Sequence, residues 1–454
     1  MSPRTDLHSF NRLAIHLSFA LDAFIDELSR LRAADFPTAT AFSFIDDLKA
    51  AAEQQRADVQ VILGDFAFDP AGALARLKSE HRKAWARLGQ LSALQNAQTR
   101  KVPWSLEPTI ERLGKTLIPD SQLLACSVDR YSYEITWWKA KSSPGGQSAP
   151  IRGMLFLPSL HRLNALLHVI IGHELFHPLH DEFLDAMQPD VVARLKNSLA
   201  SLPVGGRLDQ ALERARTIWR RALEELICDM GAAALFGPAA VSAIDAFLLP
   251  YEPDQVPEDP EFYPPDRYRL RQVVRYAFDS QGGQKAMDDL IDELVTRPQF
   301  TSLGTAVRDY WKGLRQFVAD TPDETALDAD PLTRAAYTEV QATLADAWRF
   351  VRLKVEPNAL LWTTTSGEVA WHLENLRSLV PSPGSANSEA GESTPASPSA
   401  VAIAAWFEEI FNRSSAGAPA TSVTDYQRSC RLLFKSIEDA EVIRAYPSPT
   451  RLMP

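Results

Sequence analysis

Cysteine is scarce in this chain, whose 454 residues include three, at Cys126, Cys228 and Cys430. Three widely separated thiols cannot build a disulfide framework, which excludes the small disulfide-stabilised domains of secreted proteins. The odd number favours reduced thiols, and we therefore expect a cytoplasmic protein.

The chain also lacks an excess of positive charge and long apolar runs. Its 47 lysines and arginines and 58 aspartates and glutamates give a formal net charge of −11 at pH 7. This acidity argues against nucleic acid or an anionic membrane as the main partner. The apolar stretch from Leu13 to Ile25 is interrupted by His16 and Asp22. It is therefore neither a signal peptide nor a membrane span, and its period predicts an amphipathic helix.

The most informative segment is residues 173–177, which read His-Glu-Leu-Phe-His. On a helix, His173 and His177 project from one face, so both imidazoles can bind one metal ion. Two imidazoles, a third protein ligand and a water are the donor set of a catalytic zinc site. Glu174 lies between the ligands, where its carboxylate can accept a proton from that water. The preceding apolar residues predict a buried helix, and they are Leu163, Leu166, Leu167, Ile170 and Ile171.

A third zinc ligand is expected on a second helix, at residues 209–236, which ends before a Gly-Pro pair. Glu225 and Asp229 share one face of this helix because they are four residues apart. Glu225 is the candidate ligand, and the adjacent Glu224, about 100° around the helix, is the alternative. Cys228 is a weaker ligand candidate, because it faces elsewhere on the helix, and we interpret it as a small core residue.

These two segments resemble the gluzincins, a family of zinc peptidases. The resemblance covers residues 130–280. It implies that His173, His177 and Glu225 bind Zn²⁺, and that Asp229 accepts a hydrogen bond from a ligand histidine and fixes its tautomer. The stretch between His177 and Glu225 is longer than in the simplest members of the family.

Two further residues near the motif affect this interpretation. Pro178 directly follows the second histidine, so the helix should kink or end near this proline. The metzincins, a sister family, would have a glycine and a third histidine shortly after His177. That glycine is missing here, although His180 remains a competing ligand.

A small sheet is expected directly before the motif. Its three strands are predicted at residues 123–128, 131–138 and 151–157. In zincins an edge strand pairs with extended substrate, and the strand at 151–157 is our candidate. Zincins also supply a downstream side chain that stabilises the oxyanion. The candidates are Tyr263, Arg267 and Tyr268, of which we select Tyr263 as catalytic.

The expected fold class is α+β, mainly α, with a zincin-like core flanked by helical segments. Length and composition allow two or three domains. We expect a helical region at 1–103, a metallopeptidase domain at 104–320, a helical extension at 321–380, a disordered linker at 381–400 and a helical tail at 401–454. In the tail, an apolar face that includes Trp406 and Phe407 can dock back on the chain or bind a protein partner.

The expected function is that of a zinc-dependent endopeptidase, with Glu174 as general base and a protein or peptide as substrate. Two alternatives stay open. One is a zinc hydrolase that acts on a non-peptide amide, and the other is a catalytically inactive helical scaffold.

Overall fold

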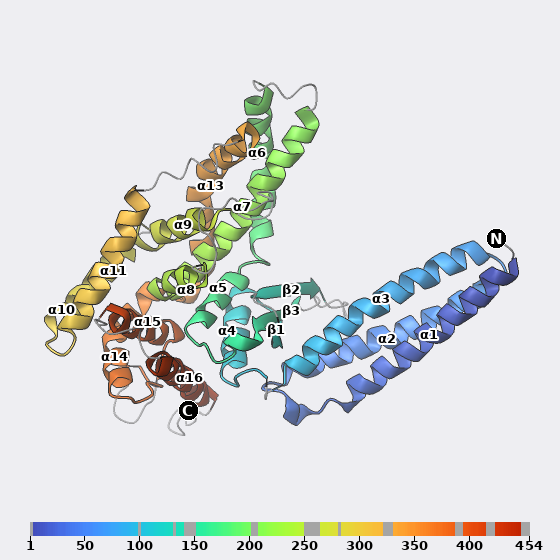
Figure 1. Cartoon of the computed structure of the whole chain (residues 1–454), viewed down its shortest axis with the longest axis horizontal. Coiled ribbons are helices and arrows are strands. Elements are labelled where there is room, and N and C mark those ends of the chain that lie inside the picture. The colour runs from blue at the N-terminus through green and yellow to red at the C-terminus, as the bar shows by residue number, and fades with distance from the viewer. Residues whose placement is uncertain are drawn as a thin grey trace, which may run out of the picture. The chain divides into compact units, whose positions relative to one another are not determined.

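A computed structural model gives the fold and describes ten segments of the chain. They are residues 3–98, 101–129, 133–139, 151–200, 208–248, 264–279, 283–320, 330–385, 394–414 and 423–445. The described part is mainly helical and contains one three-stranded sheet (Figure 1), which confirms the α+β, mainly α class. The chain divides into two compact units. The first comprises Met1–Lys115 and Asp120–Arg162, and the second comprises Thr116–Pro119 and Leu163–Pro454.

Three long helices form most of the first unit. They are α1 (Pro3–Arg30), α2 (Thr40–Asp65) and α3 (Pro70–Asn96), and they lie side by side (Figure 1). Leu17, Leu21 and Phe24 of α1 are buried in their core, as the amphipathic pattern predicts. The side chain of Asp69 caps α3, and Pro70 occupies the first helical turn, where its missing N–H costs little.

The sheet of the first unit differs from the prediction in one respect that concerns function. Its strands are β1 (Ser121–Val128), β2 (Glu134–Lys139) and β3 (Ile151–Pro158). The order is β1-β3-β2, with β3 parallel to β1 and antiparallel to β2. The strand predicted at 151–157 is therefore central, and its assignment as an edge strand that pairs with substrate was wrong. Gly153 fits this position, because a Cβ there would lie 2.6 Å from Leu123 and 2.8 Å from Trp137.

A buried carboxyl lies at the start of α4 (Leu106–Leu117). Glu107 is fully buried, and the Thr38 hydroxyl donates a hydrogen bond to its Oε1. Its Oε2 has no hydrogen-bond partner among the described residues. Burial raises the pKa of Glu107 to about 8, and the Thr38 hydrogen bond opposes this shift.

Glu107→Gln is expected to stabilise the protein at alkaline pH. The raised pKa means that the folded state holds a proton that the unfolded state releases above about pH 4.5, so stability falls as the pH rises from there towards 8. Glutamine has no proton to lose. We expect the variant to gain about 1–3 kcal/mol in the free energy of unfolding near pH 8 and little near pH 5. Urea unfolding at both pH values measures this, with Glu53→Gln as the exposed control on α2. Equal gains at both pH values would contradict the assignment.

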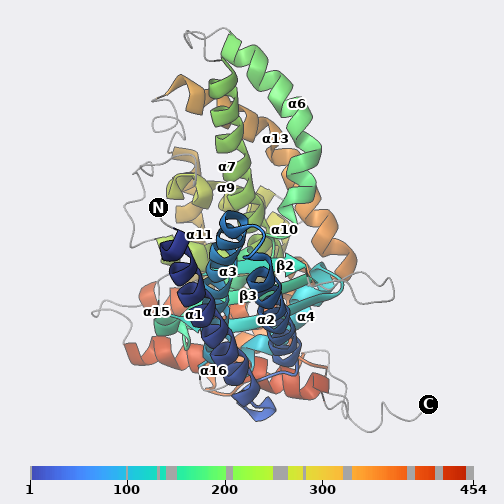
Figure 2. The ribbon, with the colours of Figure 1, turned by 90° about the vertical axis from the view of Figure 1, so that its right-hand side faces the viewer.

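The second unit is built around α7 (Leu208–Phe236), which confirms the helix predicted at 209–236. Gly237 ends it with a φ of +53°, a conformation that suits glycine. Figure 2 shows α6 (His180–Ala200) and α13 (Pro331–Val355) beside α7. The other helices of this unit are α8 (Pro238–Leu248), α9 (Asp266–Asp279), α10 (Gly283–Thr296), α11 (Thr301–Asp320), α14 (Val369–Arg377), α15 (Pro398–Ser414) and α16 (Val423–Ala445).

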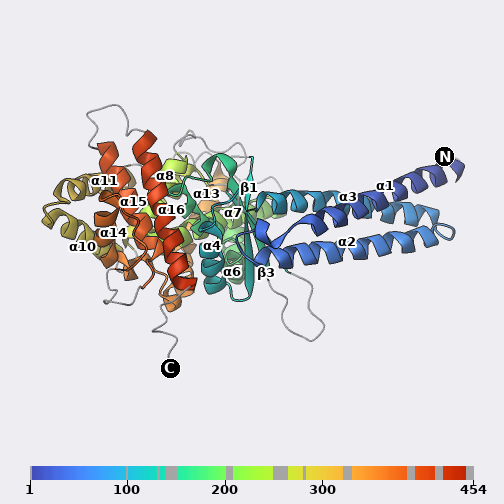
Figure 3. The same cartoon turned by 90° about the horizontal axis from the view of Figure 1, so that it is seen from below.

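The C-terminal tail packs against the other helices of the second unit. Helix α15 packs against α7, α8, α11, α14 and α16, and Figure 3 shows α14 to α16 close to α11. Residues 400–407 are all buried, so the apolar face predicted for the tail is covered by the chain itself. Of the linker predicted at 381–400, residues 386–393 lie outside the described part. On either side of them, Gly384 and Pro395 form an isolated β-bridge.

All three cysteines are buried and form no disulfide. No helix in the described segments is long and apolar enough to cross a membrane.

Candidate metal centre

The motif lies on an irregular helical segment of the second unit. A 3₁₀-helix, η3 (Leu167–Ile170), leads into the short α5 (Ile171–Glu174), and a series of turns follows up to α6. The helix therefore ends at Glu174, earlier than the end predicted near Pro178. Proline has no N–H to donate to the Glu174 carbonyl, and the N–H of His177 bonds to it instead, at 3.3 Å. The prediction that Leu163 is buried was also wrong, since it is 64% exposed.

Small residues bring the motif close to α7. A Cβ on Gly172 would lie 3.1 Å from the Ala232 Cα, so the two backbones nearly touch. A Cβ on Gly231 would lie 2.2 Å from the Phe176 ring. Larger side chains at either glycine would push the motif away from α7, which carries the candidate third ligand.

Both ring nitrogens of His173 face carboxylates of α7. Its Nδ1 lies 2.8 Å from the Asp229 Oδ1, which is the contact that the gluzincin resemblance implies. Its Nε2 lies 3.6 Å from the Glu225 Oε2. With a hydrogen on Nδ1 donated to Asp229, Nε2 presents its lone pair towards Glu225.

Arg269 is a residue of this centre that the sequence analysis missed. It comes from α9 and donates two hydrogen bonds to Asp229, each of 2.9 Å. Its Nη2 also lies 3.3 Å from the Glu225 Oε2. Although burial opposes it, Arg269 and His173 hold the pKa of Asp229 well below its usual range. The signal in the sequence is that Arg269 is one turn before the buried Val273, on the apolar face of α9.

Of the residues proposed to stabilise the oxyanion, the two that the structure describes contact residues outside this centre. Tyr263 lies outside the described residues. Tyr268 is buried, and its hydroxyl accepts a hydrogen bond of 2.6 Å from Gln341 of α13. The Arg267 guanidinium lies over the Phe317 ring, 5.7 Å from its centroid. The structure therefore adds no support for any of the three as a catalytic residue.

His177 lies among several donor atoms. Its Nε2 is 3.8 Å from the Glu174 Oε2, and its Nδ1 is 3.5 Å from the Glu224 Oε1. Within the described segments, two groups of three residues have ligand atoms that all lie within 4.8 Å of one another. They are His173, His177 and Cys228, and His177, His180 and Glu224. Cys228 thus faces the histidine pair, contrary to the prediction that it faces elsewhere.

The donors fit a zinc ion. Imidazole, carboxylate and thiolate are the three kinds of ligand that zinc prefers. The Cys228 thiol lies within 4.8 Å of both His173 and His177, whereas Glu225 lies 3.6 Å from the His173 Nε2 and is in neither group of three. The side chains of Glu225 and Asp229 are 10% and 1% exposed, and carboxylates this buried need a cation beside them. The guanidinium of Arg269 supplies part of the positive charge that these two carboxylates need. Burial raises the pKa of Cys228 to about 12, which favours a neutral thiol in the absence of metal.

The choice of third ligand leads to a prediction. Glu225→Ala is expected to weaken zinc binding by at least about 100-fold, and Asp229→Ala by about 10–100-fold, because Asp229 orients His173. Cys228→Ala, the matched control one turn from Glu225, should change the zinc affinity little. Competition with a chromogenic chelator measures the three affinities. The opposite ranking of Glu225→Ala and Cys228→Ala would identify the thiolate as the third ligand.

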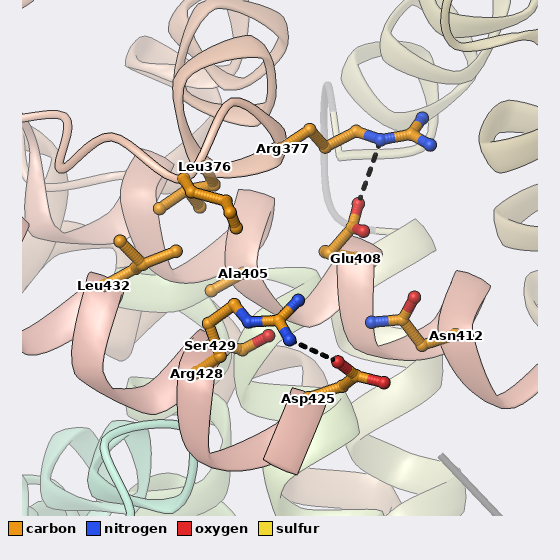
Figure 4. Close-up of a pocket in the computed structure, with 10 residues that line it drawn as sticks. Leu376, Arg377, Ala405, Glu408, Asn412, Asp425, Arg428, Ser429 and Leu432 are labelled. Atoms are coloured by element: carbon orange, nitrogen blue, oxygen red, sulfur yellow. Dashed lines mark ion pairs between the residues drawn. The ribbon is translucent and has the colours of Figure 1, made fainter. Parts of the chain in front are cut away.

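A separate pocket lies among α14, α15 and α16 (Figure 4). Its cavity volume is about 190 Å³, and none of its lining residues belongs to the metal centre. Arg428 pairs with Asp425 at 2.9 Å, and Arg377 pairs with Glu408 at 3.6 Å. The charged groups of this lining are thus paired with one another.

Comparisons of the chain with protein-family profiles, with curated proteins and with solved structures found no match.

Proposed function

We propose that the protein is a zinc-dependent peptidase of the gluzincin type, which cleaves within protein or peptide substrates. One observation carries the proposal. Asp229 binds the Nδ1 of His173 at 2.8 Å while the Nε2 of the same ring faces Glu225. An imidazole that is oriented by a buried carboxylate and directed at a second carboxylate is typical of a zinc ligand.

His173, His177 and Glu225 would hold the ion. Zinc supplies a Lewis acid and brings the pKa of its water close to neutral. Glu174 would then accept the proton of the attacking water and deliver it to the leaving amine. Its carboxylate is 4% exposed, and its Oε2 lies 3.8 Å from the Nε2 of His177, on the ligand side of the centre. Arg269 would keep Asp229 ionised and in place.

Peptide is proposed as the substrate class on the strength of the motif. A non-peptide amide and a structural metal in an inactive scaffold are the competing functions. A cytoplasmic location is proposed from the three buried, unbonded thiols. Because the face of α15 is covered, a protein partner of the tail would have to bind another surface.

The test is a cleavage screen with and without metal. We expect the purified protein to contain about one tightly bound zinc per chain and to cleave a subset of unfolded proteins in a lysate digest. Treatment with 1,10-phenanthroline should abolish cleavage, and added zinc should restore it. The screen reads out new protein termini by mass spectrometry. Zinc without any new termini would favour the scaffold, and cleavage that persists without zinc would contradict the mechanism.

A further inference from the structure

A second group of metal-binding side chains adjoins the centre, and the proposed function uses only one of its three members, His177. It consists of His177, His180 and Glu224, which come from the turn before α6, from the first residue of α6, and from α7. The Nε2 of His180 lies 3.1 Å from the Glu224 Oε1, and the Nδ1 of His177 lies 3.5 Å from the same oxygen. We propose that these three side chains form a second divalent-cation site, with zinc as the preferred ion.

Two of the three separations among these ligand atoms match a zinc coordination sphere, and all three lie within 4.8 Å. Zinc–nitrogen and zinc–oxygen bonds of about 2.0–2.1 Å in a tetrahedron place neighbouring ligand atoms about 3.3–3.4 Å apart. The observed separations of 3.1 and 3.5 Å fall on either side of that value. Two imidazole nitrogens and one carboxylate oxygen also favour zinc over calcium or magnesium, which require more oxygen ligands.

Neighbouring residues leave the ligand atoms available. Arg221 binds the Glu224 Oε2 at 2.9 Å, so that Oε1 remains for the ion. The Nδ1 of His180 lies 3.4 Å from the Asp181 Oδ1 but forms no hydrogen bond with any described residue, whereas the Nε2 faces Glu224 at 3.1 Å. The side chains of His180 and Glu224 are 8% and 15% exposed, so the site is shielded but open to solvent on one side.

The two sites share His177 through different ring nitrogens. Its Nδ1 faces Glu224, whereas its Nε2 faces Glu174 and the first centre. An imidazole that binds ions at both nitrogens has to release its remaining ring proton to solvent. The second ion should therefore bind more weakly than the first, and its binding should release a proton. The sharing of His177 between two ions depends on the proposed zinc centre. The second site itself, formed by His177, His180 and Glu224, does not depend on it.

Four single variants and one control test the proposal by metal content rather than by activity. Each full-length protein is dialysed against a range of zinc concentrations, and bound zinc is measured by elemental analysis. We expect about two ions in the wild type, about one in His173→Asn and in His180→Asn, and none in His177→Asn. Glu224→Gln should lose the same ion as His180→Asn. His16→Asn, an exposed histidine of the first unit, should retain both ions, and circular dichroism verifies the fold of each variant.

The variants that lose a zinc ion distinguish the second site from the zinc centre of the proposed function. A single ion that is lost in His173→Asn and retained in His180→Asn and Glu224→Gln would overturn the second site and leave the proposed function intact. A single ion that is lost in His180→Asn and retained in His173→Asn would support the second site and overturn the proposed zinc centre. Two ions in both His180→Asn and Glu224→Gln would overturn the second site, since neither side chain would then be a ligand.

Discussion

Glu174→Gln is expected to reduce hydrolysis by about 10²–10⁴-fold while leaving the fold and the zinc content unchanged. The amide has nearly the shape of the carboxylate, so the packing of this buried side chain is preserved. It cannot accept the proton of the attacking water, and the leaving amine then receives none. The measurement is a pair: turnover of a substrate identified in the cleavage screen, and zinc by elemental analysis.

The control for this variant is Glu182→Gln on α6, where an exposed carboxylate pairs with Lys354 at 2.6 Å. It removes the same charge from the same part of the chain and should leave turnover unchanged. A Glu174→Gln protein that binds zinc normally and cleaves at the wild-type rate would contradict the general-base role. Loss of zinc along with activity would instead place Glu174 among the groups that hold the ion.

The helices and strands that the sequence predicted correctly are those with a local periodic pattern of apolar residues. The helix at 209–236 and the strands before the motif follow from apolar repeats bounded by glycine and proline, and all were found close to their predicted limits. The contact of Asp229 with His173 joins residues far apart in sequence. It was expected only from the resemblance of the Glu225 and Asp229 spacing to that of the gluzincins. The roles proposed for Glu174 and Glu225 stay predictions.

Features that depend on tertiary packing were not predicted. The central position of β3 is set by which strands pair with it, and its apolar run is compatible with either position in the sheet. Arg269 reaches the centre because α9 packs on α7. The sequence alone does not show which residue an arginine on an apolar helix face will contact. Cys228 was assigned to the wrong side because the end of α5 at Glu174 moves His177 away from ideal helical geometry.

The C-terminal tail contributes to the stability of the motif segment. Trp406 of α15 is 1% exposed, and its Nε1 donates a hydrogen bond of 3.1 Å to the carbonyl of Leu166, just before η3. From α16, the Tyr426 hydroxyl donates a hydrogen bond of 2.7 Å to the Asn164 Oδ1. The two tail helices thus hold the segment that leads directly into the candidate zinc ligands.

Trp406→Ala is therefore expected to lower the free energy of unfolding by about 3–5 kcal/mol, because it opens a cavity the size of an indole and leaves the Leu166 carbonyl without this donor. Urea unfolding measures the loss, and zinc affinity should fall as well, since the ligand segment loses its support. Trp406→Phe keeps most of the ring but removes the N–H, so it should cost about 1–3 kcal/mol. Trp371→Ala is the matched control, because this tryptophan on α14 is 43% exposed and its removal should change stability by no more than about 0.5 kcal/mol. Similar small losses for Trp406→Ala and Trp371→Ala would mean that the tail does not stabilise the motif segment. A large loss of stability with unchanged zinc affinity would mean that the zinc ligands are positioned by α7 alone.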